Sequence, residues 1–104
     1  MSQINFENQT GTTTEENAKI KEPKMYKVIL HNDDYTTMEF VVIILKKIFH
    51  KSTNDALRIM FEVHNNGTGI AGVYTYEIAE TKIASVYQLA IKKEFPLKCS
   101  IEAE

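Results

Sequence analysis

The sequence predicts an α+β domain in which a small three-stranded antiparallel sheet is packed by three helices, in the order β-α-α-β-α-β. Short apolar runs alternate with longer amphipathic segments between residues 25 and 104. Clusters of capping residues stand where the helices should begin. Residues 97–102 alternate strictly between apolar and polar side chains. Such alternation is typical of a strand with one solvated face, and it favours an antiparallel sheet.

The first strand is expected at residues 25–31, where MYKVIL alternates and contains β-branched side chains. Thr36 and Glu39 then have the spacing of a capping box, in which a hydroxyl and a carboxylate bind free helix N–H groups. We therefore expect a helix at about 37–50. Its buried side is predicted to contain Phe40, Val41, Ile44, Leu45, Ile48 and Phe49.

The second helix is expected to begin in the capping cluster Ser52–Asp55. Apolar residues and one histidine then recur at helical spacing, which predicts a single buried face. That face contains Leu57, Met60, Phe61 and His64. Asn65–Gly67 should end the helix, because Asn and Gly tolerate the left-handed backbone conformation found at helix C-termini.

The remaining elements are a strand at 70–75, a helix at about 76–93 and a strand at 97–102. The helix is predicted to bury Ala79, Ile83, Val86, Tyr87 and Ala90. Pro96 separates it from the last strand. In that strand Leu97, Cys99 and Ile101 should face the core.

The chain of 104 residues is long enough for one domain. Residues 1–24 are mostly polar and bury too little apolar surface to offset an ordering cost of about 1–2 kcal/mol per residue. We therefore interpret 1–24 as a flexible N-terminal arm and 25–104 as the core domain. The arm is either a terminal segment without a function of its own or a segment that reaches a partner.

Charge and cysteine content exclude several classes of protein. The net charge is −2 and the pI is near 5.9, which argues against a nucleic-acid binder with a basic surface. Cys99 is the only cysteine, so no disulfide can form within the chain. No apolar run reaches the ~18–20 residues of a membrane-spanning helix, and no targeting signal is recognisable at the N-terminus. We expect a cytoplasmic protein that works with neither nucleic acid nor membrane.

The turn after the first strand is unusually polar, with Asn32, Asp33 and Asp34 in succession. If the first two helices pack side by side, His64 can approach this turn. The polar groups would then meet at the mouth of an apolar groove lined by Met38, Val41, Met60 and Val63. Such a site suits a ligand with a cationic head and an apolar tail, although ordinary helix capping also accounts for an Asn-Asp-Asp turn.

A small metal- or carboxylate-dependent enzyme is the alternative. Asp33, Asp34 and His64 could act as acids, bases or metal ligands, with His31 as a further ligand. The sequence contains no HExxH, cysteine pair, nucleophile elbow or glycine-rich phosphate loop to support a reaction class. We therefore expect no catalytic activity, no cofactor and no metal.

Several motifs together resemble those of the ClpS family, bacterial and plastid adaptors of the N-degron pathway. They are MYKVILHNDDYTTMEFV, the Val63-His64 pair, GVYTYEIAETKIA and FPLKCSIE. The resemblance extends from about residue 24 to 102. It implies a small α/β sandwich that is not an enzyme. It also implies binding of a free N-terminal Leu, Phe, Tyr or Trp, and delivery of that protein to a ClpA-type AAA+ unfoldase, which feeds the ClpP peptidase.

The resemblance also implies roles for individual residues. Asn32, Asp33 and His64 correspond to the residues that hold the α-amino group. The walls or rim of the side-chain pocket correspond to Asp34, Thr36, Met38, Val41, Met60, Val63 and Leu97. Met38 matches the gatekeeper against β-branched residues. Glu77 and Lys82, with Tyr35 near them, match positions that dock on the N-terminal domain of the unfoldase, and the arm 1–24 matches an extension that acts during handover.

One departure from the family pattern stands at Thr37, where the family commonly has proline. Proline at a first helical position presets φ. We therefore expect the helix start to be looser here, and with it the Met38 gate.

Overall fold

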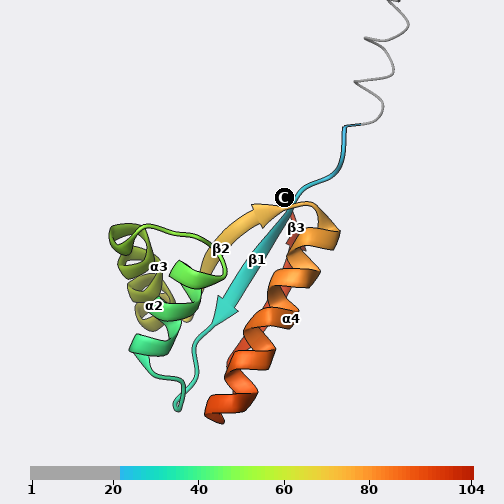
Figure 1. The fold of residues 1–104 in the computed structure, drawn as a ribbon. Helices are drawn as coiled ribbons and strands as arrows, with labels where there is room; N and C mark the ends of the chain where they lie inside the picture. The colour runs from blue at the N-terminus through green and yellow to red at the C-terminus, as the bar shows by residue number, and fades with distance from the viewer. Residues whose placement is uncertain (1–21) are drawn as a thin grey trace, which may run out of the picture.

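A computed structural model of the chain describes residues 22–104. Three strands and three helices follow one another in the predicted order (Figure 1). They are β1 (Tyr26–His31), α2 (Met38–Lys47), α3 (Thr53–Asn66), β2 (Thr68–Tyr74), α4 (Tyr76–Lys93) and β3 (Lys98–Ala103). The expectation for the arm falls almost entirely on residues outside this described part. Within the described part, no helix is both long and apolar enough to span a membrane.

The sheet has the strand order β2-β1-β3, and β1 pairs antiparallel with both neighbours. Val28 and Leu30 of β1 are fully buried, whereas the alternating Lys27 and Ile29 remain partly exposed. The helices therefore cover one face of the sheet and leave the other face accessible. This confirms the predicted fold class, including the solvated face.

The start of α2 corrects the expected cap. The N-cap is Thr37 rather than Thr36, and its hydroxyl accepts a hydrogen bond of 3.1 Å from the Phe40 N–H. Thr37 has φ −76°, which is close to the value that proline would impose. Threonine therefore supplies a cap that proline lacks, and the expectation of a looser helix start stays a prediction. The helix also ends earlier than predicted, at Lys47.

The buried face of α3 is rotated relative to the prediction. Its buried residues are Ala56, Ile59, Met60 and Val63. Leu57 and Phe61 are 39% and 49% exposed, and His64 is exposed as well. The prediction was wrong because apolar residues occupy two adjoining faces of this helix, and the sequence alone does not say which face meets the sheet.

Tyr87 connects α4 to β3 by way of its phenolic hydroxyl. This group accepts a hydrogen bond from the Cys99 N–H and donates one to the Cys99 carbonyl, both at 3.2 Å. The ring of Tyr87 is more exposed than predicted, but its polar end reaches the buried edge of the sheet. Leu97 and Cys99 lie in the core beside it, as the alternation predicted.

The buried thiol of Cys99 should make the folded protein less stable at alkaline pH. Burial raises the pKa of Cys99 from 9.0 to about 12. Between these two pKa values the Cys99 thiol ionises in the unfolded chain but not in the folded protein. The free energy of unfolding should therefore decrease as the pH rises from about 9 to about 12. Urea titrations across this pH range check the prediction. Cys99→Ala should show a flatter dependence, and an equally steep one would contradict it.

Candidate functional site

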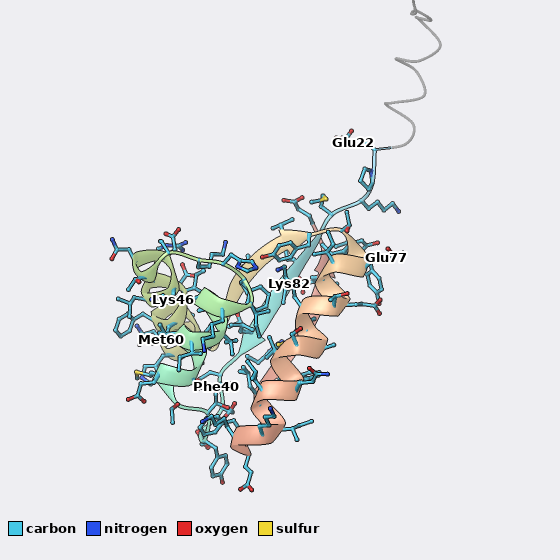
Figure 2. The ribbon with its side chains drawn as sticks, in the orientation of Figure 1. Glu22, Phe40, Lys46, Met60, Glu77 and Lys82 are labelled. Carbon is cyan, nitrogen blue, oxygen red and sulfur yellow. The ribbon has the colours of Figure 1, made fainter. Side chains whose placement is uncertain are left out.

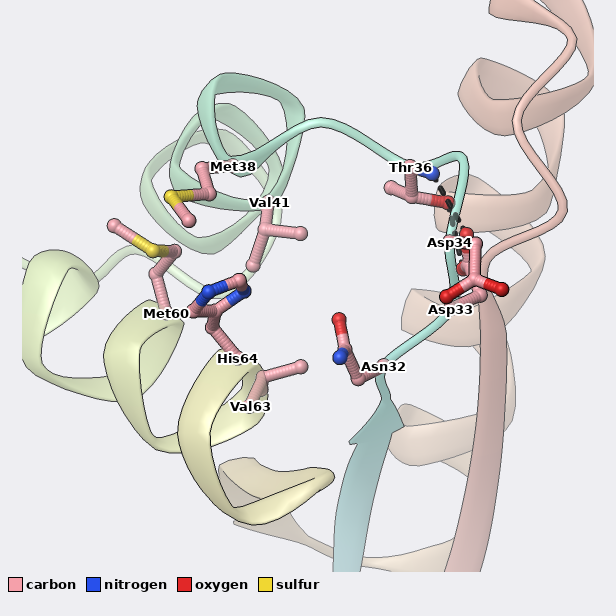
Figure 3. A pocket seen from close by; sticks show the side chains of 9 residues that line it. All are labelled: Asn32, Asp33, Asp34, Thr36, Met38, Val41, Met60, Val63 and His64. Carbon is pink, nitrogen blue, oxygen red and sulfur yellow. Dashed lines mark hydrogen bonds between the residues drawn. The ribbon is translucent and has the colours of Figure 1, made fainter.

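A pocket of about 280 Å³ lies where β1 ends, between the β1–α2 loop and helices α2 and α3 (Figure 3). Its volume is close to the lower end for small-molecule sites, about 300 Å³, so it suits a group of the size of one amino-acid residue. The residues that line it are Asn32, Asp33, Asp34, Thr36, Met38, Val41, Met60, Val63 and His64.

The Asp33 carboxylate organises the polar side of the pocket. One oxygen, Oδ1, accepts hydrogen bonds from the N–H groups of Tyr35 (2.8 Å) and Thr36 (2.7 Å). The other, Oδ2, accepts from the Thr36 hydroxyl at 2.7 Å and keeps further acceptor capacity. Burial alone would raise the pKa of Asp33, but the hydrogen bonds from Thr36 and Tyr35 outweigh it and lower the pKa. Asp33 therefore holds its negative charge at neutral pH.

A backbone hydrogen bond fixes Asn32 against the end of α3. The Asn32 N–H donates to the carbonyl of Gly67 at 2.9 Å. Gly67 closes α3 with φ 89°, a conformation that strains other residues, and its own N–H donates to the Val63 carbonyl at 3.0 Å. Because His64 is in the last turn of α3, this link brings it to the same pocket as Asn32.

Opposite sides of the pocket differ in chemistry. In Figure 3 the β1–α2 loop carries Asp33 and Asp34 on one side, and α2 and α3 carry the apolar side chains and His64 on the other. Asn32 lies between the two sides. Two carboxylates and the negative end of the α3 dipole favour a cationic group at the mouth. Met38, Val41, Met60 and Val63 favour an apolar group within.

The close packing of α3 on β2 depends on Gly69. A Cβ atom at this position would lie 2.8 Å from Cγ2 of Val63 and 3.2 Å from the carbonyl oxygen of Ile59. Any larger residue would therefore displace α3, and with it two residues of the pocket, Val63 and His64.

We expect Gly69→Ala to lower the free energy of unfolding by about 1–3 kcal/mol through overpacking, and to weaken ligand binding at the same time. Thermal unfolding and ligand titration measure the two effects. Thr68→Ala is the matched control, because Thr68 is the exposed neighbour of Gly69 in the same strand. Equal effects of the two variants would contradict the packing argument.

The structure does not bring Leu97 to the pocket. This residue is 4% exposed and belongs to the core at the start of β3, and it is absent from the pocket lining. The nine other residues predicted for the α-amino site and the side-chain pocket all line the same cavity. Their individual roles stay predictions.

The three residues predicted for docking are not together. Tyr35 is exposed in the loop that follows the C-terminal end of β1. Tyr74 pairs with Tyr26 at the opposite end of β1, so α4 begins there and carries Glu77 and Lys82 (Figures 1 and 2). The expectation that Tyr35 lies near the other two is therefore wrong.

Lys82 of α4 is half-buried. Its Nζ donates to the carbonyl of Ile48 at 2.8 Å, and lies 5.1 Å from the ring centroid of Tyr74 and 6.0 Å from that of Phe49. A cation at the C-terminal end of α2 stabilises the helix through its dipole and one free carbonyl. Lys82 thus connects α4 to the C-terminal end of α2, whereas Met38 stands at the N-terminal end of that helix.

The metal alternative has little geometric support within residues 22–104, where no group of three or more His, Cys, Asp or Glu side chains could hold an ion. His31 is engaged elsewhere, since its Nε2 lies 2.7 Å from the Ser100 hydroxyl on β3. Asp33 and Asp34 lie across the pocket from His64 (Figure 3).

Two features of the site were missed in the sequence. The first is the cap of α2, which the capping-box spacing placed at Thr36 and the structure places at the next residue, Thr37. The Gly67 carbonyl, which positions Asn32, left no signal beyond the glycine itself, because the bond joins residues that are 35 positions apart, 67 − 32.

Comparisons with known proteins identify the family. The protein-family model for the ATP-dependent Clp protease adaptor protein ClpS matches residues 21–100. The ClpS adapter of Desulfatibacillum aliphaticivorans is 59% identical over 91 residues, 88% of each chain. That of Myxococcus xanthus is 54% identical over 100 residues, 94% of each chain. The solved structure of Agrobacterium tumefaciens ClpS2 bound to L-phenylalaninamide has a TM-score of 0.75 at 41% identity, and the match covers 80% of this chain and all of that one. This chain therefore belongs to the ClpS family of adaptors of the ATP-dependent Clp protease.

Proposed function

We propose that the protein is an N-degron adaptor that binds proteins with a free N-terminal Leu, Phe, Tyr or Trp and delivers them to a ClpA-type AAA+ unfoldase, without catalysing a reaction itself. The observation that carries the proposal is the coexistence of a polar, negatively charged mouth and apolar walls in one pocket. The ligand of the Agrobacterium relative supports it. L-phenylalaninamide has a free amino group, a phenyl side chain and an amide, as the first residue of a polypeptide does.

The α-amino group of a chain has a reference pKa near ~8, so it is mainly a cation with three N–H donors at neutral pH. The Asn32 side chain offers a carbonyl acceptor, Asp33 offers the free capacity of Oδ2, and His64 can accept through one ring nitrogen while neutral. Hydrogen bonds to charged groups contribute about 1.5–3 kcal/mol each.

The first side chain supplies the remainder of the affinity. Burying a Leu or Phe side chain contributes about 1.5–3 kcal/mol. Together with two or three charged hydrogen bonds, this gives about 5–12 kcal/mol before the cost of association is subtracted, so the affinity depends on both parts. Neither part suffices alone, so an internal leucine or an acetylated N-terminus is excluded.

For docking, we propose that the unfoldase contacts the N-terminal end of α4, where Glu77 is exposed. Lys82 would act there by holding the end of α2 through Ile48. Tyr35 would contribute a separate contact at the other end of the molecule, and the arm 1–24 would act during handover.

The variant Glu77→Lys tests the docking proposal. It should abolish adaptor-dependent degradation while peptide binding is retained.

Titration with two peptides tests the proposed function. One begins with a free Leu, and its twin has the same sequence with an acetylated N-terminus. An adaptor binds the first with micromolar affinity and ignores the second, because acetylation removes the charge and two of the donors. Similar affinities for both would reject the proposal, as would conversion of the peptide to product.

His64→Ala should weaken binding of the Leu peptide at neutral pH by about tenfold, because it removes one of the acceptors proposed for the ammonium group. Titration with the free and the acetylated peptide measures the loss. An unchanged Kd in this variant would remove His64 from the role.

A further inference from the structure

We propose that an apolar groove beside the pocket is a second subsite, which takes an apolar side chain at the third residue of the bound polypeptide. The inference rests on the proposed function and deepens it, because it adds a sequence preference beyond the N-terminal residue.

The groove lies between the outer surfaces of α2 and α3 and has a volume of about 420 Å³. It is lined by Met38, Glu39, Val42, Ile43, Leu57 and Met60. Met38, Ile43 and Leu57 are 41%, 45% and 39% exposed, so a large part of its apolar surface contacts water. Covering that surface with another apolar group would be favourable, roughly in proportion to the area removed from water.

The groove adjoins the pocket. Met38 and Met60 line both cavities, and Figure 3 shows the two side chains next to each other at one wall of the pocket. This pair of methionine side chains therefore forms a wall that the two spaces share. Methionine side chains are flexible and adapt to the shape of a ligand. The opposite wall is the β1–α2 loop, which is polar and held by the hydrogen bonds of Asp33.

The spacing selects the third residue. An extended chain rises about 3.3 Å per residue, and successive side chains point to opposite sides. With the first side chain in the pocket, the second points away from the protein. The third returns to the same side about 6.6 Å further along. A chain that leaves over Met38 and Met60 therefore brings its third side chain to the groove.

The lining also defines the chemistry of the preferred side chain. Five of the six residues are apolar, which favours Leu, Ile, Met or Phe. Glu39 is the only charged residue in the lining, so an acidic third residue would meet a like charge. We expect the order Leu, then Ser, then Asp at this position.

Three peptides of equal length and composition elsewhere test the subsite with the full chain. They begin Leu-Ser-Leu, Leu-Ser-Ser and Leu-Leu-Ser. We expect the first to bind about tenfold more tightly than the second, and the third to resemble the second. If the three peptides bind equally, the subsite is refuted while the proposed function stands. If none of the three binds, the proposed function itself fails.

Two variants of α3 connect the preference to the groove. Leu57→Gln should remove the advantage of Leu-Ser-Leu and leave the affinity for Leu-Ser-Ser unchanged. Phe61→Gln is the matched control, because Phe61 is an exposed apolar residue of the same helix that does not line the groove. It should leave the advantage intact. If both variants remove the advantage, or neither does, the groove is not its source.

Discussion

Replacing Asp33 with alanine is expected to weaken binding of a peptide with a free N-terminal Leu by at least about 100-fold, or nearly 3 kcal/mol. The substitution removes the charge that faces the ammonium group. It also removes the acceptor that orders the loop, since Tyr35 and Thr36 together donate three hydrogen bonds to this carboxylate. Isothermal titration with the free and acetylated peptides measures the loss.

Asp33→Asn separates the two contributions. Its amide oxygen can still accept the backbone hydrogen bonds that Oδ1 accepts now, so the loop should keep its shape while the charge is lost. We expect about a tenfold loss for this variant, the difference between a charged and a neutral hydrogen bond. If the turn only caps a helix, Asp33→Ala should lower the free energy of unfolding and leave the Kd unchanged, which would contradict the proposed role.

Met38→Ala is expected to admit peptides that begin with Ile or Val. If Met38 has the predicted gating role, branching at Cβ places a methyl group against its side chain, and overpacking of this kind costs about 1–3 kcal/mol. Removing the side chain should therefore tighten Ile and Val binding by about 5- to 150-fold and weaken Leu binding, because an apolar wall is lost. Competition titrations with peptides that begin with Leu, Ile or Val give the discrimination directly.

Met38→Leu is the control for this prediction. Leucine and methionine have similar volumes, and such exchanges usually cost less than about 1.5 kcal/mol. The discrimination against Ile and Val should persist in it. Because Met38 is partly exposed, neither variant is expected to unfold the protein. Unchanged discrimination in Met38→Ala would remove Met38 from the gating role. In Met38→Ala the preference for an apolar third residue should also fall, since Met38 lines the groove.

Much of the fold could be predicted from local patterns. The long helix at 76–93 agrees with α4 at both ends, and the alternation at 97–102 locates β3 to within a residue. These segments carry their own signals in spacing, capping and proline position. The boundaries of α2 were less accurate. The capping-box spacing favoured Thr36, but in the structure the Thr36 hydroxyl donates to Asp33 and the Thr37 hydroxyl caps the helix instead.

The candidate site, too, could be predicted from the sequence only in part. The sequence by itself determined the polar turn, the apolar spacing and the family motifs, because these depend on residues that are near neighbours in the chain. Only the tertiary structure decided which face of α3 is buried, that Lys82 holds the end of α2, and that Leu97 lies outside the pocket. Contacts between distant segments depend on how whole helix faces pack against the sheet, and a short stretch of sequence leaves several such packings open.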